Sequence, residues 1–135
     1  MTARILVVED NEKNLTLIRD VLEYHGYEVL IARDGAAGVA LAKQFPPDVA
    51  LIDIQMPVMD GLTASAAIRN READTGRART PIVALTANAM AHQVEQYITA
   101  GMDGHVAKPI QAAELFEALT RLTSPETAAA EEVAA

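Results

Sequence analysis

The sequence predicts an α/β fold in which helices cover a parallel five-stranded sheet. Short β-branched runs alternate five times with longer segments whose apolar residues recur three and four positions apart, and this alternation is typical of βα units on a parallel sheet. The composition agrees, because 50% of the 135 residues are hydrophobic and 4% are aromatic. The core must therefore consist mainly of Val, Ile, Leu and Ala. This length is typical of one domain.

Three strands and two helices are expected in the first part of the chain. The strands are Arg4–Val8, Tyr27–Ile31 and Val49–Ile52, and the helices run from the capping residue Asn11 to His25–Gly26 and from Asp34–Gly35 to the residue before Pro46. In the first helix, Leu15, Ile18 and Leu22 are spaced to share one face. The second helix ends at Pro46 because proline has no amide hydrogen to continue it.

Two strands and three helices are expected in the rest of the chain. The strands are Ile82–Leu85 and His105–Ala107, and the helices are Asp60–Arg71, Ala89–Ala100 and Gln111–Leu122. The polar segment from Glu72 to Thr80 contains Gly76 and predicts a loop. Residues 124–135 contain three glutamates and no basic residue, which is typical of disorder. We therefore expect one domain over residues 1–123 and a disordered acidic tail over residues 124–135.

Charge and residue types exclude several classes of function. The 11 Lys and Arg against 19 Asp and Glu give a formal net charge of -8, which repels the phosphate backbone of nucleic acids. The absence of cysteine excludes disulfides, zinc thiolate sites and cysteine nucleophiles. No apolar run approaches the roughly 20 residues needed to cross a bilayer, and Met1 to Arg4 leads directly into a strand rather than a signal peptide. We expect a soluble cytoplasmic protein without a membrane or nucleic-acid partner.

Polar residues follow the predicted strands at the edge where parallel α/β folds bind their ligands. Glu9 and Asp10 follow the first strand, Asp53 the third, Thr86 the fourth and Lys108 the fifth. If the first and third strands are neighbours, three carboxylates converge on one pocket, and their repulsion calls for a cation. Oxygen ligands favour Mg2+, or a similar ion such as Mn2+, over zinc.

The same edge carries the groups that phosphoryl transfer requires. Lys108 would place an ammonium group beside Asp53 or an incoming phosphoryl oxygen, and Thr86 would supply a hydroxyl donor. Catalysis of phosphoryl transfer consists mainly of positioning and charge neutralisation. Asp53 is therefore the candidate nucleophile, and it would form an aspartyl phosphate.

Four motifs, in this order, resemble the receiver domain of bacterial response regulators. They are Ile5–Asn11, Asp53–Gly61, Ala84–Met90 and Ala100–Pro109. The resemblance covers Arg4 to about Leu122 and implies a flavodoxin-like (βα)5 doubly wound fold with the strand order 2-1-3-4-5. The family members that the chain resembles are response regulators of the single-domain type. The run Leu85–Met90 is also similar to the receivers of hybrid kinases.

The resemblance also implies a role for each site residue. Asp53 accepts phosphate from a phosphohistidine, while Glu9, Asp10 and the backbone carbonyl of Gln55 help to hold Mg2+. Lys108 binds the phosphoryl group, and its bond to the following proline is cis. The side chains of Gln55 and Asn88, two positions after Asp53 and Thr86, modulate the attack of water on the phosphoryl group.

Signal output is expected to start at Thr86, which the resemblance identifies as the switch hydroxyl. The surface of the fourth helix, fifth strand and fifth helix should then rearrange and bind a downstream protein, with Met90, Val94, Tyr97 and His105 as candidate contacts. His105 stands where receivers usually carry Tyr or Phe. Its titratable ring would either turn inward as the switch residue or remain on the surface without that role.

The expected function is a phospho-accepting response regulator in a two-component system or phosphorelay. Its phosphodonor would be a sensor histidine kinase or a histidine phosphotransfer protein, its catalysis would be limited to its own phosphorylation and slow dephosphorylation, and a homodimer is left open. The alternatives within the fold are a receiver excised from a hybrid sensor histidine kinase, which Met1 and the acidic tail disfavour, and a phosphorylation-independent adaptor. A Mg2+-dependent phosphatase would need a second acid at Gln55. Flavodoxin-like cofactor binding would need aromatic residues in the loops.

Overall fold

A computed structural model of the chain, which describes residues 3–54, 59–76, 79–87 and 90–123, contains a five-stranded parallel sheet. The strand order is β2-β1-β3-β4-β5. The strands are β1 (Arg4–Val8), β2 (Glu28–Ala32), β3 (Val49–Asp53), β4 (Ile82–Thr86) and β5 (Gly104–Ala107). Ile5 pairs with Val49 between β1 and β3, and Asp53 pairs with Leu85 between β3 and β4. The predicted doubly wound (βα)5 fold and its strand order are confirmed.

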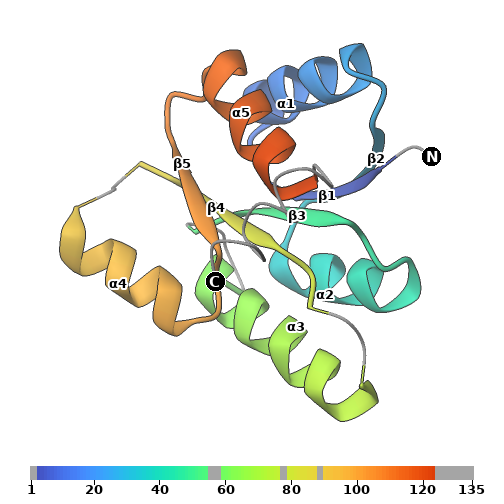
Figure 1. Ribbon diagram of the computed structural model, residues 1–135, viewed down its shortest axis with the longest axis vertical. Coiled ribbons are helices and arrows are strands. Elements are labelled where there is room, and N and C mark those ends of the chain that lie inside the picture. The colour runs from blue at the N-terminus through green and yellow to red at the C-terminus, as the bar shows by residue number, and fades with distance from the viewer. Residues whose placement is uncertain (1–2, 55–58, 77–78, 88–89, 124–135) are drawn as a thin grey trace, which may run out of the picture.

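The helices form one layer on each face of the sheet (Figure 1). On one face lie α1 (Glu12–Tyr24) and α5 (Ala112–Thr123), and on the other lie α2 (Gly35–Gln44), α3 (Gly61–Thr75) and α4 (Ala91–Thr99). Side chains of each strand alternate between the two layers, so that Leu51 packs in the core with α1 and α5 while Ile52 packs in the core with α3 and α4. Because both faces are covered, every residue of β3 and β4 is buried.

Side-chain caps start three helices at the residues that the sequence predicted. Asn11, Asp34 and Asp60 each accept a hydrogen bond from the backbone amide three residues later, at 3.1, 2.8 and 2.8 Å. Each cap satisfies an amide that has no partner within its helix. The caps of α1 and α3 therefore fix the residues at which the loops after β1 and β3 end and the helices begin.

Helix α3 is longer than the sequence predicted, and the expected loop from Glu72 onward was wrong in its first part. The helix continues to Thr75 and ends at Gly76, whose φ of 69° is left-handed. The guanidinium of Arg69 binds Glu72 one turn later at 2.7 Å and stabilises this part of the helix. The other predicted ends of helices and strands lie within two residues of the observed ones in the described ranges.

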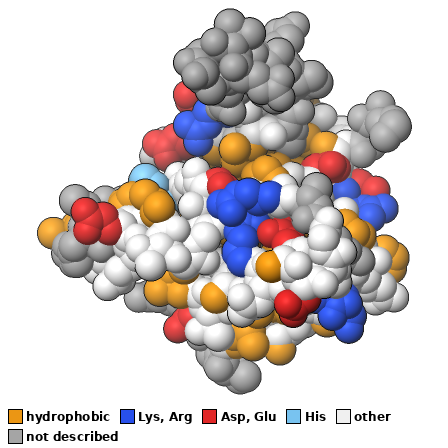
Figure 2. All heavy atoms as spheres, turned by 60° about the horizontal axis from the view of Figure 1, so that its bottom comes forward, with side chains coloured by type: hydrophobic (Ala, Val, Ile, Leu, Met, Phe, Trp, Pro, Cys, Tyr) orange, Lys and Arg blue, Asp and Glu red, His pale blue; other side chains and the backbone are white. Residues whose placement is uncertain are grey.

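Arg69 also connects α3 to the loops that precede β4 and β5. Its Nε donates to the carbonyl of Gly101 at 2.9 Å, its Nη1 donates to the carbonyl of Thr80 at 2.8 Å, and its Nη2 pairs with Asp103 at 2.9 Å. Asp103 also pairs with Arg79 at 2.7 Å. Figure 2 shows basic and acidic side chains gathered side by side in the middle of one face. The network fixes the starts of two strands whose opposite ends carry candidate site residues.

No helix in the described ranges is long and apolar enough to cross a membrane. The predicted tail, residues 124–135, lies outside the described residues. The domain boundary at residue 123 therefore stays a prediction, although α5 is described as far as that residue.

We expect Arg69→Met to lower the free energy of unfolding by about 2–4 kcal/mol, because it removes a nearly buried cation from two carboxylates and two carbonyls. Urea unfolding measures this loss. Arg19→Met is the matched control: Arg19 is exposed and pairs with Glu23 at 3.7 Å, so its loss should stay below about 1 kcal/mol. Equal losses in the two variants would contradict a structural role of the Arg69 network.

Candidate functional site

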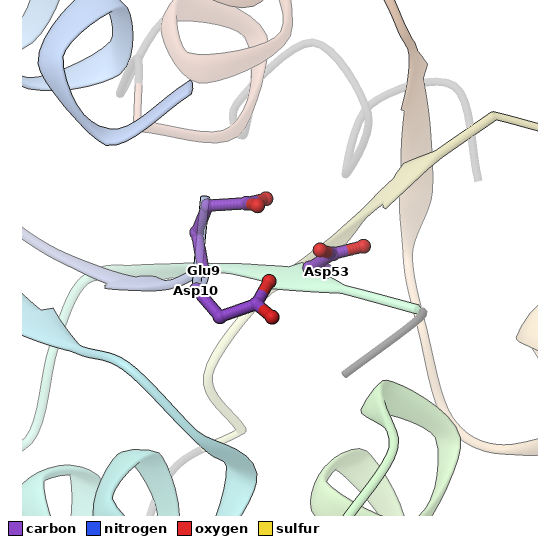
Figure 3. Close-up of side chains that lie close together, drawn as sticks. All are labelled: Glu9, Asp10 and Asp53. Atoms are coloured by element: carbon purple, nitrogen blue, oxygen red, sulfur yellow. The ribbon is translucent and has the colours of Figure 1, made fainter. Parts of the chain in front are cut away.

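Three carboxyl groups meet at the carboxyl edge of the sheet. Glu9 and Asp10 follow β1, and Asp53 is the last residue of the neighbouring strand β3. Each offers one oxygen, and these oxygens lie within 4.8 Å of one another. Figure 3 shows the carboxyl groups of Glu9 and Asp10 pointing toward the side on which Asp53 lies. Glu9 and Asp53 are buried whereas Asp10 is exposed, so the cluster is open to solvent at Asp10.

Lys108 brings an ammonium group to this cluster from the loop after β5. Its Nζ lies 3.0 Å from Oδ1 of Asp53 and 3.6 Å from Oε2 of Glu9. The amide of Lys108 donates to the carbonyl of Thr86 at 2.8 Å, and its bond to Pro109 is cis, as the resemblance implied. The pairing with Asp53 that the sequence predicted is therefore present. A single ammonium group does not balance three carboxylates, so an excess of negative charge remains at this edge.

The environment of Glu9 is the most unusual in the cluster. Its Oε1 accepts hydrogen bonds from the amide of Asn11 at 3.1 Å and from Nδ2 of Asn14 at 3.4 Å. Its Oε2 is buried and accepts no hydrogen bond from the described residues. Burial, and then the charge of Asp53, raise the pKa of Glu9, while Lys108 acts in the opposite direction.

The cluster fits a hard divalent cation. Mg2+ and similar ions bind carboxylate oxygens and keep part of their water shell, and Asp10 leaves the cluster open to solvent. The buried Oε2 of Glu9 forms no hydrogen bond within the described residues and lies 3.6 Å from Nζ of Lys108, so a bound cation would satisfy it. The cluster contains no His or Cys, the ligands that zinc prefers. Gln55, expected to add a backbone carbonyl, lies outside the described residues.

Thr86 is buried at the end of β4, and its side-chain partner was not foreseen. Its hydroxyl lies 2.7 Å from the phenolic oxygen of Tyr97 in α4, and Tyr97 is 4% exposed. The expectation that Tyr97 is a surface contact was therefore wrong. Val94 is three residues earlier and also packs against the core, so the helical spacing of these two apolar side chains was a signal for burial.

The other candidate output residues lie at the surface between α4, β5 and α5. Met90 is exposed, Val94 is half-buried and His105 is exposed. A cavity of about 320 Å³ is lined by residues including Tyr97, Ile98 and His105. His105 lies at the surface, and its role as a switch residue stays a prediction.

Asn88 and two histidines complete the account of residues near the site and on the surface. Asn88 lies outside the described residues, and so does the side chain of His92. His25 is exposed, and its ring stacks on Phe116 with centroids 3.8 Å apart.

The fold and the acidic cluster define an α/β protein of the doubly wound class with a candidate cation site at the carboxyl ends of its strands. The family model of the response regulator receiver domain matches residues 5–120. The chain belongs to this family.

Relatives are found both among sensor kinases and among small response regulators. The sensor protein GacS of Pseudomonas syringae pv. syringae is 42% identical over 120 residues, which are 89% of this chain and 13% of GacS. The polar-differentiation response regulator DivK of Brucella ovis is 34% identical over 119 residues, which are 88% of this chain and 94% of DivK. The chain thus spans a small part of one relative and nearly all of the other.

Solved structures of similar chains include receiver domains with a metal ion or a partner. The receiver domain of a sensor histidine kinase from Pseudomonas aeruginosa holds a magnesium ion in its active site cleft; its TM-score is 0.80 at 40% identity, with 90% of this chain and 98% of that chain covered. The complex of the histidine phosphotransfer protein Ypd1 with the receiver domain of Ssk1, from Saccharomyces cerevisiae, matches with a TM-score of 0.88 at 26% identity. This match covers 93% of this chain and 92% of that chain.

The raised pKa of Glu9 predicts a loss of stability as the pH rises. The folded protein binds a proton at Glu9 more tightly than the unfolded chain does, so the free energy of unfolding falls as the pH rises from 4.5 through the raised pKa. Glu9→Gln removes this titration. Urea unfolding in a chelating buffer over that pH range should show a decrease in the wild type that is smaller in the variant. The exposed Glu23→Gln is the control, and parallel curves for wild type and Glu9→Gln would refute the effect.

Proposed function

We propose that this receiver domain takes a phosphoryl group from a phosphohistidine onto Asp53 in a reaction that requires Mg2+, which Mn2+ can replace. The observation that carries the proposal is the position of Asp53. Its carboxylate lies 3.0 Å from the ammonium group of Lys108 and within the cluster formed with Glu9 and Asp10. A nucleophile between a cation site and a fixed ammonium group suits a reaction that depends on positioning and charge neutralisation.

In the proposed reaction, a carboxylate oxygen of Asp53 attacks phosphorus while the bond from phosphorus to the histidine nitrogen breaks. The imidazole leaves with the electron pair of that bond. Lys108 neutralises charge on the phosphoryl oxygens, and Glu9, Asp10, Asp53 and the carbonyl of Gln55 would hold the cation. When bound, the cation supplies further neutralisation of the transferring group.

The product carries additional negative charge at the edge of the sheet, and we propose that this charge drives the signal. Thr86 turns its hydroxyl toward the phosphoryl oxygens, and the surface formed by α4, β5 and α5, including His105, changes its affinity for a downstream protein. Water then removes the phosphoryl group slowly, under the influence of the side chains of Gln55 and Asn88. The chemistry of this chain is limited to these two steps.

The proposed phosphodonor is a histidine kinase or a histidine phosphotransfer protein, and we place the reaction in the cytoplasm. The sensor kinase relatives and the partner of the Ssk1 receiver support this class. The 42% identity with GacS, of which the match covers 13%, favours a second assignment, in which this chain acts as the receiver of a hybrid kinase. A homodimer remains a further proposal for the phosphorylated state.

Incubation with acetyl phosphate and Mg2+ should phosphorylate the wild-type protein, and Asp53→Asn should reduce labelling to background because the nucleophile is lost. Intact-mass spectrometry measures the added phosphoryl group. The control is Asp20→Asn, since Asp20 is exposed on α1 and should leave labelling unchanged. Labelling of Asp53→Asn at the wild-type level would refute the assignment of the acceptor.

Calorimetric titration should detect binding of Mg2+ to the wild-type protein, and Asp10→Asn should weaken this binding by at least about tenfold. The reason is that even groups that only support metal ligands change affinity by roughly 10–100-fold. Asp20→Asn again serves as the control, because it removes one negative charge outside the cluster. An unchanged affinity in Asp10→Asn would exclude Asp10 from the cation site.

A further inference from the structure

The hydroxyl of Thr86 is held on the side of the sheet that faces α4. Its oxygen lies 2.7 Å from the phenolic oxygen of Tyr97, and the two residues are 3% and 4% exposed. In β4, the side chains of Ile82 and Ala84 pack in the same core as Tyr97. The side chain of Thr86 lies on the same face as theirs, since side chains two residues apart in a strand share one face.

The side chain of Asp53 belongs to the opposite face of the sheet, which is covered by α1 and α5. In β3, Val49 and Leu51 pack in the core with α1 and α5, and Asp53 is the next residue of that series. Asp53 pairs with Leu85 in the neighbouring strand, so Thr86 follows one residue beyond it. To reach a phosphoryl group on Asp53, the hydroxyl of Thr86 must therefore turn away from Tyr97.

We propose that Tyr97 is a positioning residue for Thr86, whose phenolic hydroxyl competes with the phosphoryl group on Asp53 for the threonine hydroxyl. The proposal rests on the function proposed above for Asp53. Phosphorylation breaks the hydrogen bond between Thr86 and Tyr97. The strength of that bond contributes to the free energy needed to change from the unphosphorylated to the phosphorylated state. The ring in this proposal lies on α4 and is distinct from that of His105 on β5, which is an exposed residue.

The position of Tyr97 also connects this step to the surface. Tyr97 lines the cavity of about 320 Å³ together with Ile98, His105 and Arg121, which come from α4, β5 and α5. When the hydroxyl of Thr86 turns toward Asp53, the phenolic hydroxyl of Tyr97 loses this hydrogen bond. Because the ring borders this cavity, a shift of Tyr97 that follows the loss of the bond would change the surface between α4, β5 and α5.

The test uses beryllium trifluoride, which occupies the place of a phosphoryl group on a carboxylate, with Mg2+ at saturation. Tyr97→Phe keeps the ring and removes the competing hydroxyl. We expect beryllium trifluoride to bind about fivefold more tightly to this variant by calorimetry. That factor corresponds to a net hydrogen bond of about 1 kcal/mol at 1.4 kcal/mol per tenfold change. Tyr24→Phe is the matched control, because Tyr24 is 86% exposed and should leave the affinity unchanged.

The same substitution in a Thr86→Val background separates positioning from a general structural effect. Without the threonine hydroxyl there is no competition, so Tyr97→Phe should leave the affinity of Thr86→Val unchanged. A second measurement uses wild-type protein labelled with 3-fluorotyrosine. The fluorine resonance that is absent from Tyr97→Phe should shift when beryllium trifluoride is added, and this shift should be lost in Thr86→Val.

The outcomes distinguish this inference from the proposed function. If the wild type binds no beryllium trifluoride in the presence of Mg2+, the function proposed for Asp53 fails. If the wild type binds it and Tyr97→Phe binds equally or more weakly, the role of Tyr97 is overturned. An equal gain with and without the Thr86 hydroxyl, or a Tyr97 resonance that does not respond, overturns that role as well.

Discussion

Repulsion among three carboxyl groups at the end of β1 and β3 is the interaction on which the site depends. Glu9, Asp10 and Asp53 come close because β1 and β3 are parallel neighbours whose chains end at the same edge. Lys108 offsets part of this repulsion, yet the carboxyl of Glu9 is fully buried and its pKa is raised. The fold thus gathers acidic groups at one point, and a divalent cation bound there would offset their repulsion.

The alternation of side chains in the sheet distributes the groups at this edge between the two helical layers. Asp53 continues the face that packs against α1 and α5, whereas Thr86 continues the face that packs against α3 and α4 and bonds to Tyr97. The proposed acceptor and the proposed switch hydroxyl therefore have different surroundings, although their strands are neighbours. In the proposed function, a rotation of the Thr86 side chain would transfer a change at Asp53 to the layer that contains α4.

The Arg69 network and the candidate site lie at opposite edges of the sheet. The starts of β4 and β5 are connected by Arg69, Arg79 and Asp103 through ion pairs and hydrogen bonds to backbone carbonyls. At the other ends of the same strands, β4 ends with Thr86 and β5 ends directly before Lys108. The contacts that join the starts of these strands are therefore separate from the groups of the candidate site.

The sequence by itself determined the elements, the capping residues and the residue types of the candidate site, because these depend on local periodicity, backbone preferences and motif order. Asn11 and Asp60 cap their helices as predicted, the helix expected to open at Asp34 is capped by that residue, and Glu9, Asp10 and Asp53 converge as the strand ends suggested. The tertiary structure decided the last turn of α3 and the hydrogen-bond partner of Tyr97. The contacts responsible join residues on different elements: Arg69 to Asp103, 34 positions apart, and Thr86 to Tyr97, 11 positions apart. Periodicity indicates that a side chain is buried, but which hydroxyl or carboxylate it meets there depends on how the helices pack on the sheet.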